Sequence, residues 1–250
     1  MAKPVALQLY SVRDAAGKDL AGTLKIVADI GYPYVEMAGL HGKTPAEFKK
    51  LLDDLGLKTC SSHCAVFDPE KRAQVEDEAR TLGFSHLVSG FGPKDFETED
   101  AIKAAAQKVN QAVDHFGPKG FSISIHNHWW EFDGPNKGDL LYKLAPKACP
   151  QLDIYWVTVG GADPVKVMKR YAKRCKLLHV KDGAATQAQK HPMTAIGKGN
   201  VKTEAILKAA EKSAVEFLIV ELDDCATDMI EAVRDSYTFL VGKGLATGNK

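Results

Sequence analysis

The sequence lacks a block of like charge, a long hydrophobic run and any segment of low complexity. Its 250 residues include 33 Lys+Arg and 32 Asp+Glu, which gives a formal net charge of +1. A near-neutral chain argues against electrostatic capture of nucleic acid or of an anionic membrane. No apolar stretch approaches the roughly 18–20 residues that a membrane-spanning helix needs. No signal peptide is visible, so we expect a cytoplasmic protein unless an export signal has been trimmed.

Cysteine pairs and phosphate-binding glycine motifs are also missing. The five cysteines are an odd number without a CxxC pair, so we expect buried free thiols and no disulfide framework. GxGxxG does not follow the first apolar run, and GxxxxGKS/T occurs nowhere. Their absence argues against an open, doubly wound nucleotide-binding sheet.

Short β-branched runs alternate with longer helical patterns along the chain. We expect strands near residues 5–10, 32–37, 57–63, 86–91, 121–128, 152–157, 176–181 and 217–222. We expect a helix after each strand, beginning near Asp19, Pro45, Pro69, Thr98, Gly138, Asp163, Lys202 and Thr227.

Eight strand–helix units of about 31 residues each have the size of a βαβ step. Strict alternation predicts a parallel sheet, which is either a closed (β/α)8 TIM barrel or an open doubly wound sheet. The count of eight favours the barrel. Because no linker interrupts the chain, we expect a single α/β domain over residues 1–250.

Polar side chains gather at the carboxyl ends of the predicted strands. Because side chains alternate along a strand, the apolar residues that face the helices turn their neighbours inward. This parity places inside the barrel Tyr10, Glu36, His63, His126, His128, Asp153, His179, Lys181 and Glu221. Each has a plain structural alternative, such as an ion pair between Glu221 and Lys181. Together they predict an active site, since barrel enzymes carry theirs at this end.

Four of these residues form a mixed nitrogen and oxygen ligand set. His126, Asp153, His179 and Glu221 end consecutive strands, from the fifth to the eighth. Imidazole together with carboxylate suits a divalent transition metal. We therefore predict a divalent ion held by these four side chains, with Mn2+, Co2+, Zn2+, Fe2+ and Mg2+ as candidates.

The motifs that carry these residues resemble a known family. They are LQLYSVR, YVEMAG, SSH, SIHNHWWEF, LDIYWVTVGGADP, LLHVKDG, IGKGNV and IVELDD. In this order they are similar to the xylose isomerase-like TIM-barrel superfamily, also called the sugar phosphate isomerase/epimerase or AP endonuclease family 2 group. The resemblance implies a (β/α)8 barrel, a divalent metal at strands five to eight, and a sugar or polyol as the small-molecule substrate.

The sequence departs from that family's pattern at strands five and six. Ketose epimerases of the superfamily usually have a glutamate as the strand-five ligand, whereas here His126 is aligned, with His128 and Glu131 as competing choices. Only Glu221 remains of their paired catalytic glutamates. The strand-six pattern Asp-x-x-His ends in Trp156, which removes a zinc ligand of the endonuclease members. DNA repair is therefore disfavoured, as is any nucleic-acid partner.

Three functions stay open. The first is a metal-dependent sugar isomerase or epimerase that works through a metal-stabilised enediolate. The second is a lyase or dehydratase acting on a keto-sugar or keto-inositol. The third is a sugar-binding barrel without catalysis. The sequence does not determine the oligomeric state, and a homo-oligomer is one of the possibilities.

Proton abstraction next to a carbonyl requires a base and a group that stabilises the oxyanion. We expect Glu221 or Glu36 to be the base, and Lys181 to donate a proton or hold the oxyanion. An ion pair with Glu221 or Asp153 is the alternative for Lys181. The residues expected to contact the substrate are His63, His128, Trp129 and Tyr10.

The segment 182–201 is the longest gap between predicted elements, and we expect a loop over the site there. Within it, Gly197-Lys198-Gly199 resembles a phosphate cradle, because barrel phosphate sites follow strands seven and eight. A simple turn that enters the next helix is favoured over that function.

Overall fold

The computed structural model describes residues 2–134, 137–186 and 192–250. Eight parallel strands form a closed barrel, in the order β2-β3-β4-β5-β6-β7-β8-β1, and the pairing of β1 with β2 closes the ring. Their bounds are β1 Lys3–Gln8, β2 Tyr34–Met37, β3 Lys58–His63, β4 His86–Ser89, β5 Ser122–His126, β6 Cys149–Asp153, β7 Leu177–Val180 and β8 Phe217–Val220. The predicted (β/α)8 TIM barrel is confirmed.

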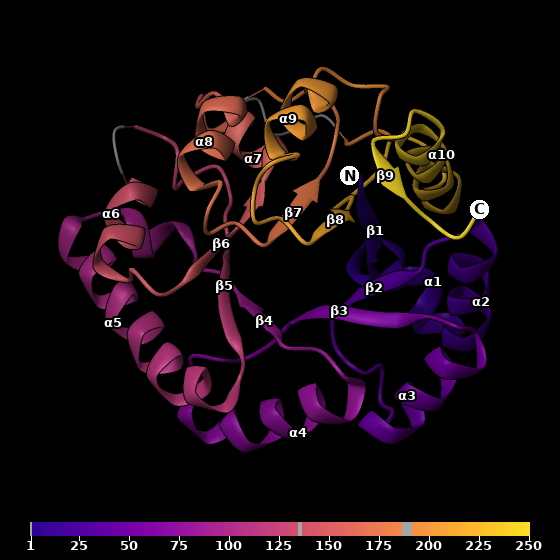
Figure 1. The fold of residues 1–250 in the computed structure, drawn as a ribbon, viewed down its shortest axis with the longest axis horizontal. Helices are drawn as coiled ribbons and strands as arrows, with labels where there is room; N and C mark the ends of the chain where they lie inside the picture. Colours follow the sequence, from indigo (N-terminus) through magenta and orange to yellow (C-terminus); the bar gives the residue numbers. More distant parts are fainter. Residues whose placement is uncertain (1, 135–136, 187–191) are drawn as a thin grey trace.

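Helices surround the barrel on its outer side (Figure 1). They are α1 Arg13–Lys18, α2 Leu20–Ile30, α3 Pro45–Asp54, α4 Arg72–Leu82, α5 Glu99–Phe116, α6 Lys137–Leu144, α7 Ile154–Val159, α8 Pro164–Tyr171, α9 Thr203–Ala210 and α10 Met229–Gly242. Side chains cap several of them: Thr44 forms a capping box with Glu47, and Asp163 accepts from two backbone N–H groups of α8. Among the described residues, no helix has both the length and the apolar character that crossing a bilayer requires.

The prediction for the sixth strand is wrong at its end. Residues 152–157 were expected as strand, but β6 ends at Asp153 and α7 begins at once. Oδ1 of Asp153 accepts hydrogen bonds from the backbone N–H groups of Tyr155 and Trp156, each at 3.0 Å. This N-cap turns the chain into a helix at the point where the strand was expected to continue.

The parity argument also fails at Tyr10. Strand β1 ends at Gln8, whose side-chain oxygen accepts from the Tyr10 N–H at 3.1 Å and starts the 3-10 helix Leu9–Val12. The Tyr10 side chain is 45% exposed, and its ring lies 4.0 Å from the guanidinium carbon of Arg13. Tyr10 therefore does not belong to the barrel interior.

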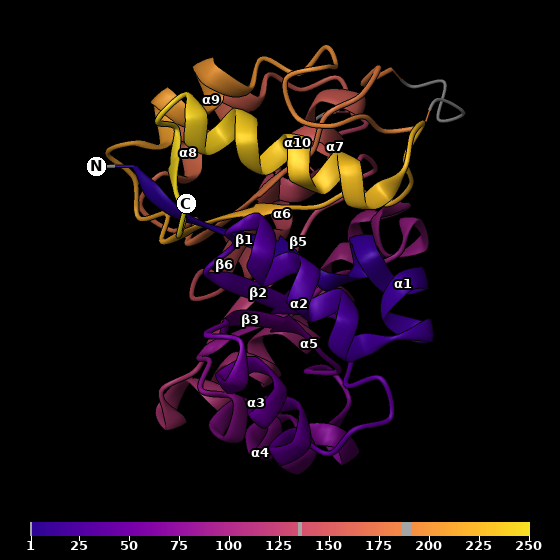
Figure 2. The same cartoon turned by 90° about the vertical axis from the view of Figure 1, so that its right-hand side faces the viewer.

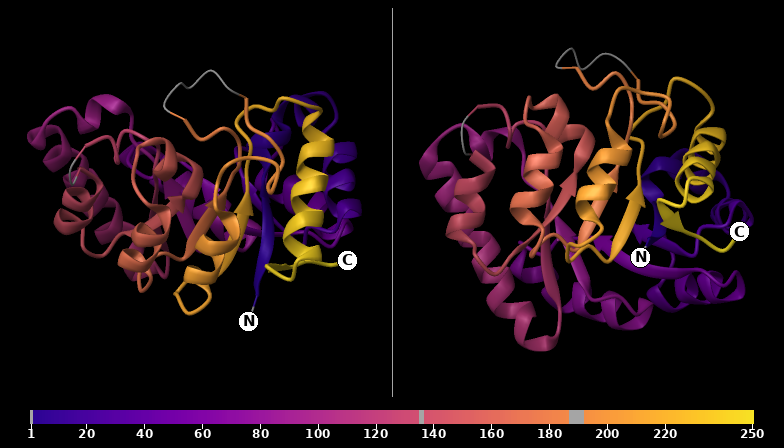
Figure 3. Two further views of the ribbon diagram at one scale, coloured as in Figure 1. Left: turned by 90° about the horizontal axis from the view of Figure 1, so that it is seen from above. Right: turned by 45° about the horizontal axis from the view of Figure 1, so that its top comes forward.

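The inside of the barrel has an apolar layer at its amino end. It is formed by Ala6, Cys60, Val88, Leu177 and Ile219, with Tyr34 and Phe217 packed against it. The two-stranded ribbon between β1 and β9 (Ala246–Thr247) lies at the same end. Both chain termini are found there as well (Figures 2 and 3). Polar side chains follow at the opposite, carboxyl end of the strands, where the candidate site lies.

Candidate metal centre

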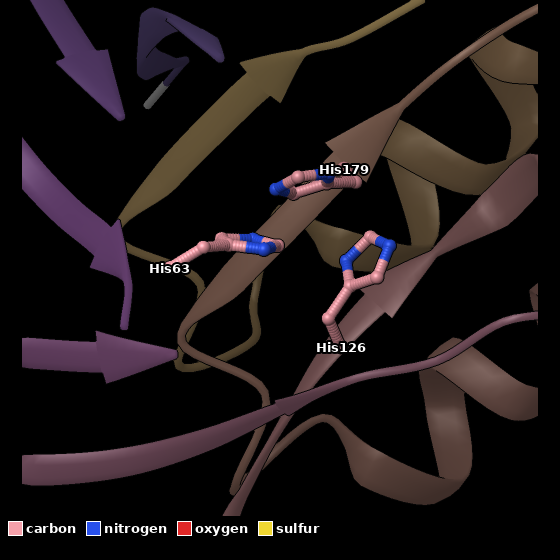
Figure 4. A group of neighbouring side chains, drawn as sticks. All are labelled: His63, His126 and His179. Carbon is pink, nitrogen blue, oxygen red and sulfur yellow. The ribbon is translucent and has the colours of Figure 1, made fainter. Parts of the chain in front are cut away.

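The four predicted ligands come together at the carboxyl end of the barrel. One donor atom from each of His126, Asp153, His179 and Glu221 lies within 4.8 Å of the others, and all four residues are buried. Neighbouring strands bring them to one level, since Asp153 pairs with His179 in the β6–β7 register. His126 and His179 also point toward His63 from β3 (Figure 4).

The inward-facing donors are two ring nitrogens and two carboxylate oxygens. Nε2 of His126 lies 3.8 Å from Oδ2 of Asp153, and Nδ1 of His179 lies 2.8 Å from Oε2 of Glu221. Oδ2 of Asp153 is buried and has no well-aligned hydrogen-bond donor. A carboxylate oxygen in this state favours a cation next to it. The mixed donor set and the closeness of its atoms fit a divalent ion.

Lys181 is the neighbour that shares the ligand oxygens. Its Nζ lies 3.1 Å from Oδ2 of Asp153, 2.7 Å from Oε2 of Glu221 and 3.0 Å from Oδ2 of Asp223. Only 1% of the residue is exposed. Burial would lower the pKa of Lys181, but the charges of Asp153, Glu221 and Asp223 hold it well above its usual value. The expected ion pair is therefore present, with three carboxylates around one ammonium.

Glu36 is completely buried below the ligands and accepts hydrogen bonds from all sides. Its donors are Nε2 of Gln8 at 2.7 Å, Oγ of Ser61 at 2.5 Å, Nε2 of Gln151 at 2.6 Å and Nε2 of His179 at 2.6 Å. Nε2 of His63 lies 3.1 Å from Oε1 of Glu36. Burial alone would raise the pKa of Glu36, but the charges of His179 and His63 and their hydrogen bonds lower it well below its usual value. This carboxylate is thus ionised and saturated, which suits a positioning group better than a base.

The two histidine ligands have opposite pKa shifts. Burial opposes the charge on His179, yet Glu36 and Glu221 raise its pKa to about 10. Burial lowers the pKa of His126 well below its usual value, and the neighbouring His179 and His63 act in the same direction. A cation between the four donors would take the place of the proton on Nδ1 of His179, while His126 is already neutral.

An aromatic cluster that includes Trp156 lies beside Lys181. The ring of Trp156 lies 5.7 Å from Nζ of Lys181. His128 stacks on Trp130 with a centroid distance of 4.3 Å, and Trp129 contacts Trp130 edge-on at 5.7 Å. Burial lowers the pKa of His128 to about 4, and Lys181 adds to the effect. His128 is therefore neutral at neutral pH.

Of the three strand-five candidates, only His126 joins the ligand cluster. Glu131 instead holds the loop after β5, where its Oε2 accepts from the His128 N–H at 3.0 Å. Burial raises the pKa of Glu131 well above its usual value. Among the described residues, neither His128 nor Glu131 belongs to a potential ligand group.

The segment Gly197-Lys198-Gly199 forms a turn, as favoured from the sequence. The backbone N–H groups of Gly197 and Gly199 donate to Oδ2 of Asp182, at 2.9 and 3.1 Å, so an internal carboxylate already uses them. Lys198 pairs with Asp235. The middle of the expected loop over the site, residues 187–191, lies outside the described residues.

Gln151 is the site residue that sequence reasoning missed. It is completely buried and lies on the inner face of β6, two residues before Asp153. Its Oε1 is 3.0 Å from Nδ1 of His126 and 3.1 Å from Nε2 of His63. Side chains two residues apart on a strand face the same side. The alternation that placed Asp153 inside the barrel therefore also places Gln151 there.

Comparisons with known proteins identify the family of this barrel. The family model described as xylose isomerase-like TIM barrel matches residues 24–240. Two solved sugar phosphate isomerase/epimerases from Parabacteroides distasonis are similar. One is 26% identical with a TM-score of 0.80, covering 99% of this chain and 96% of its own. The other is 25% identical with a TM-score of 0.82, covering 98% and 100%.

The probable 3-DHS dehydratase AsbF of Bacillus anthracis has the same fold. It is 14% identical, with a TM-score of 0.78, and the alignment covers 95% of this chain and 98% of that chain. At this identity the likeness concerns the fold alone. No match was found among the curated proteins.

Proposed function

The chain belongs to the xylose isomerase-like TIM-barrel family, and we propose that it is a divalent-metal-dependent isomerase or epimerase of a keto-sugar or a polyol-derived substrate. The observation that carries the proposal is the convergence of His126, Asp153, His179 and Glu221 at the carboxyl end of the barrel. The similarity to two sugar phosphate isomerase/epimerases supports the choice of substrate class.

The four ligands would hold the ion, and Glu36 with Gln151 would keep the two imidazole rings in place. A bound divalent ion supplies a Lewis acid that stabilises negative charge on the oxygens of an enediolate. The ammonium of Lys181 adds a fixed positive charge next to two carboxylate oxygens of the ligand set, Oδ2 of Asp153 and Oε2 of Glu221. The aromatic rings of Trp130 and Trp156 would exclude water from one side of the pocket.

Glu221 is the base that we assign. It follows β8 at the rim, and its Oε2 is used by His179 and Lys181. Among the described residues, no donor is bonded to Oε1, which leaves a lone pair for a substrate C–H. We do not assign this role to Glu36, because it is fully buried and both of its oxygens accept hydrogen bonds from the protein.

Side chains near the rim would bind hydroxyls of the sugar. The His63 side chain is 30% exposed and lines a cavity of about 300 Å³ between the loop after β2 and α4. His128, neutral at neutral pH, and the half-buried Trp129 remain proposed substrate contacts. Tyr10 lies on the exposed rim, so its proposed contact needs a substrate that reaches beyond the barrel interior.

Elimination of water is the second candidate, and one observation favours it. The strand-five ligand is His126 and not a carboxylate, so Glu221 is the one glutamate in the ligand set. Epimerisation by two carboxylates on opposite faces of the sugar needs a partner for Glu221, whereas elimination needs only one strong base.

An experiment in D2O distinguishes these functions. The purified protein is stripped of metal, reloaded separately with Mn2+, Co2+, Zn2+ or Mg2+, and incubated with a panel of keto-sugars and keto-inositols. An isomerase or epimerase introduces deuterium into a product of unchanged composition, as seen by NMR. A lyase gives a dehydrated product. Binding of a sugar without either change would contradict catalysis, and the protein would then be a sugar-binding barrel without enzymatic activity.

A further inference from the structure

We propose that Gln151 is a positioning residue that sets which ring nitrogen of His126 carries the proton, and so prepares an electron pair for a cation. The inference rests on the proposed metal centre, and it concerns a residue that does not touch the ion. It is based on the hydrogen-bond donors and acceptors in the buried layer below the ligands.

Glu36 fixes the direction of its hydrogen bonds, because an ionised carboxylate accepts hydrogen bonds and donates none. Its two oxygens contact the amide of Gln8, the hydroxyl of Ser61, the amide of Gln151 and the rings of His179 and His63. Gln8, Ser61, Gln151 and His179 must therefore each direct a hydrogen at Glu36. The Nε2 hydrogen of His63 is directed at Gln151 instead. In particular, His179 must carry a proton on Nε2, which leaves Nδ1 facing Glu221.

Glu36 also fixes the orientation of the Gln151 amide. The Gln151 atom that lies 2.6 Å from Oε2 of Glu36 must be the NH2 group, because a carbonyl oxygen there would place two acceptors in contact. The carbonyl oxygen Oε1 then faces the histidine rings, 3.0 Å from Nδ1 of His126 and 3.1 Å from Nε2 of His63. With two lone pairs it accepts from both.

The acceptor at 3.0 Å requires a hydrogen on Nδ1 of His126, so a ring with one proton carries it there and leaves Nε2 bare. That nitrogen lies 3.8 Å from Oδ2 of Asp153, which has Nζ of Lys181 at 3.1 Å but no well-aligned donor. The bare nitrogen and the carboxylate oxygen are thus close together with no hydrogen of His126 between them. An ion at about 2.1 Å from each donor, the usual length of a Zn–N or Zn–O bond, fits across this gap.

An amide at position 151 is the group that can keep the proton of His126 on Nδ1 and also donate to Glu36. A carboxylate would lie next to Glu36 as a second negative charge, and one of the pair would have to take up a proton. A hydrophobic side chain would leave the N–H of His126 without an acceptor and remove one donor from Glu36. Gln151 accepts from the ligand and donates to Glu36 at the same time, without adding charge.

The first test is made on the metal-free wild-type protein, and a variant serves only to assign its signals. Long-range 1H–15N NMR distinguishes a protonated ring nitrogen from a bare one, and His126→Gln assigns the signals. We expect His126 to be protonated on Nδ1 with Nε2 bare. Protonation on Nε2 would overturn the role of Gln151, whether or not the protein binds a metal.

The second test measures affinity for Zn2+, Mn2+ and Co2+ by calorimetry. Gln151→Met keeps the length of the side chain but removes the amide, and we expect affinity to fall by about 10–100-fold, as for other groups that orient metal ligands. Gln107→Met on the exposed face of α5 is the matched control and should leave affinity unchanged. Unchanged affinity in Gln151→Met, with the ring signals of His126 also unchanged, would overturn the inference. A wild-type protein that binds no divalent ion would instead contradict the metal centre itself, and the NMR result would still decide the tautomer.

Discussion

Nζ of Lys181 lies 2.7 Å from Oε2 of Glu221, and the same oxygen accepts from Nδ1 of His179 at 2.8 Å. One carboxylate oxygen thus faces both an ammonium and a candidate metal ligand. Lys181 also contacts Asp153, the second carboxylate of the ligand set. The fixed positive charge and a divalent ion would therefore share the same two oxygens.

This sharing predicts the behaviour of Lys181→Met. Without the ammonium, three buried or half-buried carboxylates lose their common partner, which should destabilise the metal-free protein by about 3–5 kcal/mol. A divalent ion should restore more stability to the variant than it adds to the wild type, because it no longer competes with Nζ. Urea unfolding with EDTA and with Mn2+ measures both effects. The exposed Lys212→Met is the control, and equal stabilisation of all three proteins by Mn2+ would contradict the sharing.

The ligand cluster was predictable because it depends on one simple rule. Side chains alternate along a strand, and parallel strands of a barrel end at one level, so His126, His179 and Glu221 could be placed without coordinates. The rule fails where a side chain ends the strand. Gln8 and Asp153 each accept from a backbone N–H two residues later and turn the chain into a helix.

The functions of the buried polar groups were less predictable. Sequence parity identified Glu36 as an inward carboxylate but not that four donors converge on it from β1, β3, β6 and β7. Whether a carboxylate is a base or a positioning group depends on which of its lone pairs are free. That depends on contacts between residues distant in sequence, such as Gln8 and Gln151, which no local pattern contains.

Glu221→Gln tests the proposed base. The amide is close in shape, but it cannot take a proton from carbon, so turnover should fall by about 100-fold to 10,000-fold. Circular dichroism and the unfolding midpoint check that the fold persists. The exposed Glu211→Gln should keep full activity. Activity of Glu221→Gln within a few-fold of the wild type would show that another group removes the proton.

Asp182→Ala tests how the loop after β7 is anchored. The buried carboxylate of Asp182 accepts from the N–H groups of Gly183, Gly197, Gly199 and Val201 at 2.8–3.1 Å. The hydrogen bonds of Gly183 and Val201 are buried, and each buried N–H left without an acceptor costs about 1–3 kcal/mol, so the variant should lose at least about 2 kcal/mol of stability. Hydrogen exchange should accelerate at residues 197–201. Asp235→Ala, which removes an exposed ion pair with Lys198, should cost less than about 1 kcal/mol.

His86 at the amino end of the barrel should make stability depend on pH. Its Nδ1 lies 2.7 Å from Oγ of Ser122, and its Nε2 lies 3.1 Å from Oε2 of Glu216. Burial lowers the pKa of His86 below its usual 6.5, although the charge of Glu216 acts in the opposite direction. The unfolded chain therefore takes up a proton at a higher pH than the folded protein does. The contribution of His86 to stability is complete above its unfolded pKa and is lost as the pH falls toward the folded pKa.

The measurement is the free energy of unfolding of wild type and His86→Gln at several pH values between about 7 and 5, a range that spans the unfolded pKa of histidine. Carboxylates elsewhere titrate in both proteins, so the difference between the two curves isolates His86. We expect the wild type to lose stability more steeply than the variant as the pH falls. Parallel curves would contradict a lowered pKa, and a wild type that gains stability relative to the variant would mean that Glu216 outweighs burial and raises the pKa of His86.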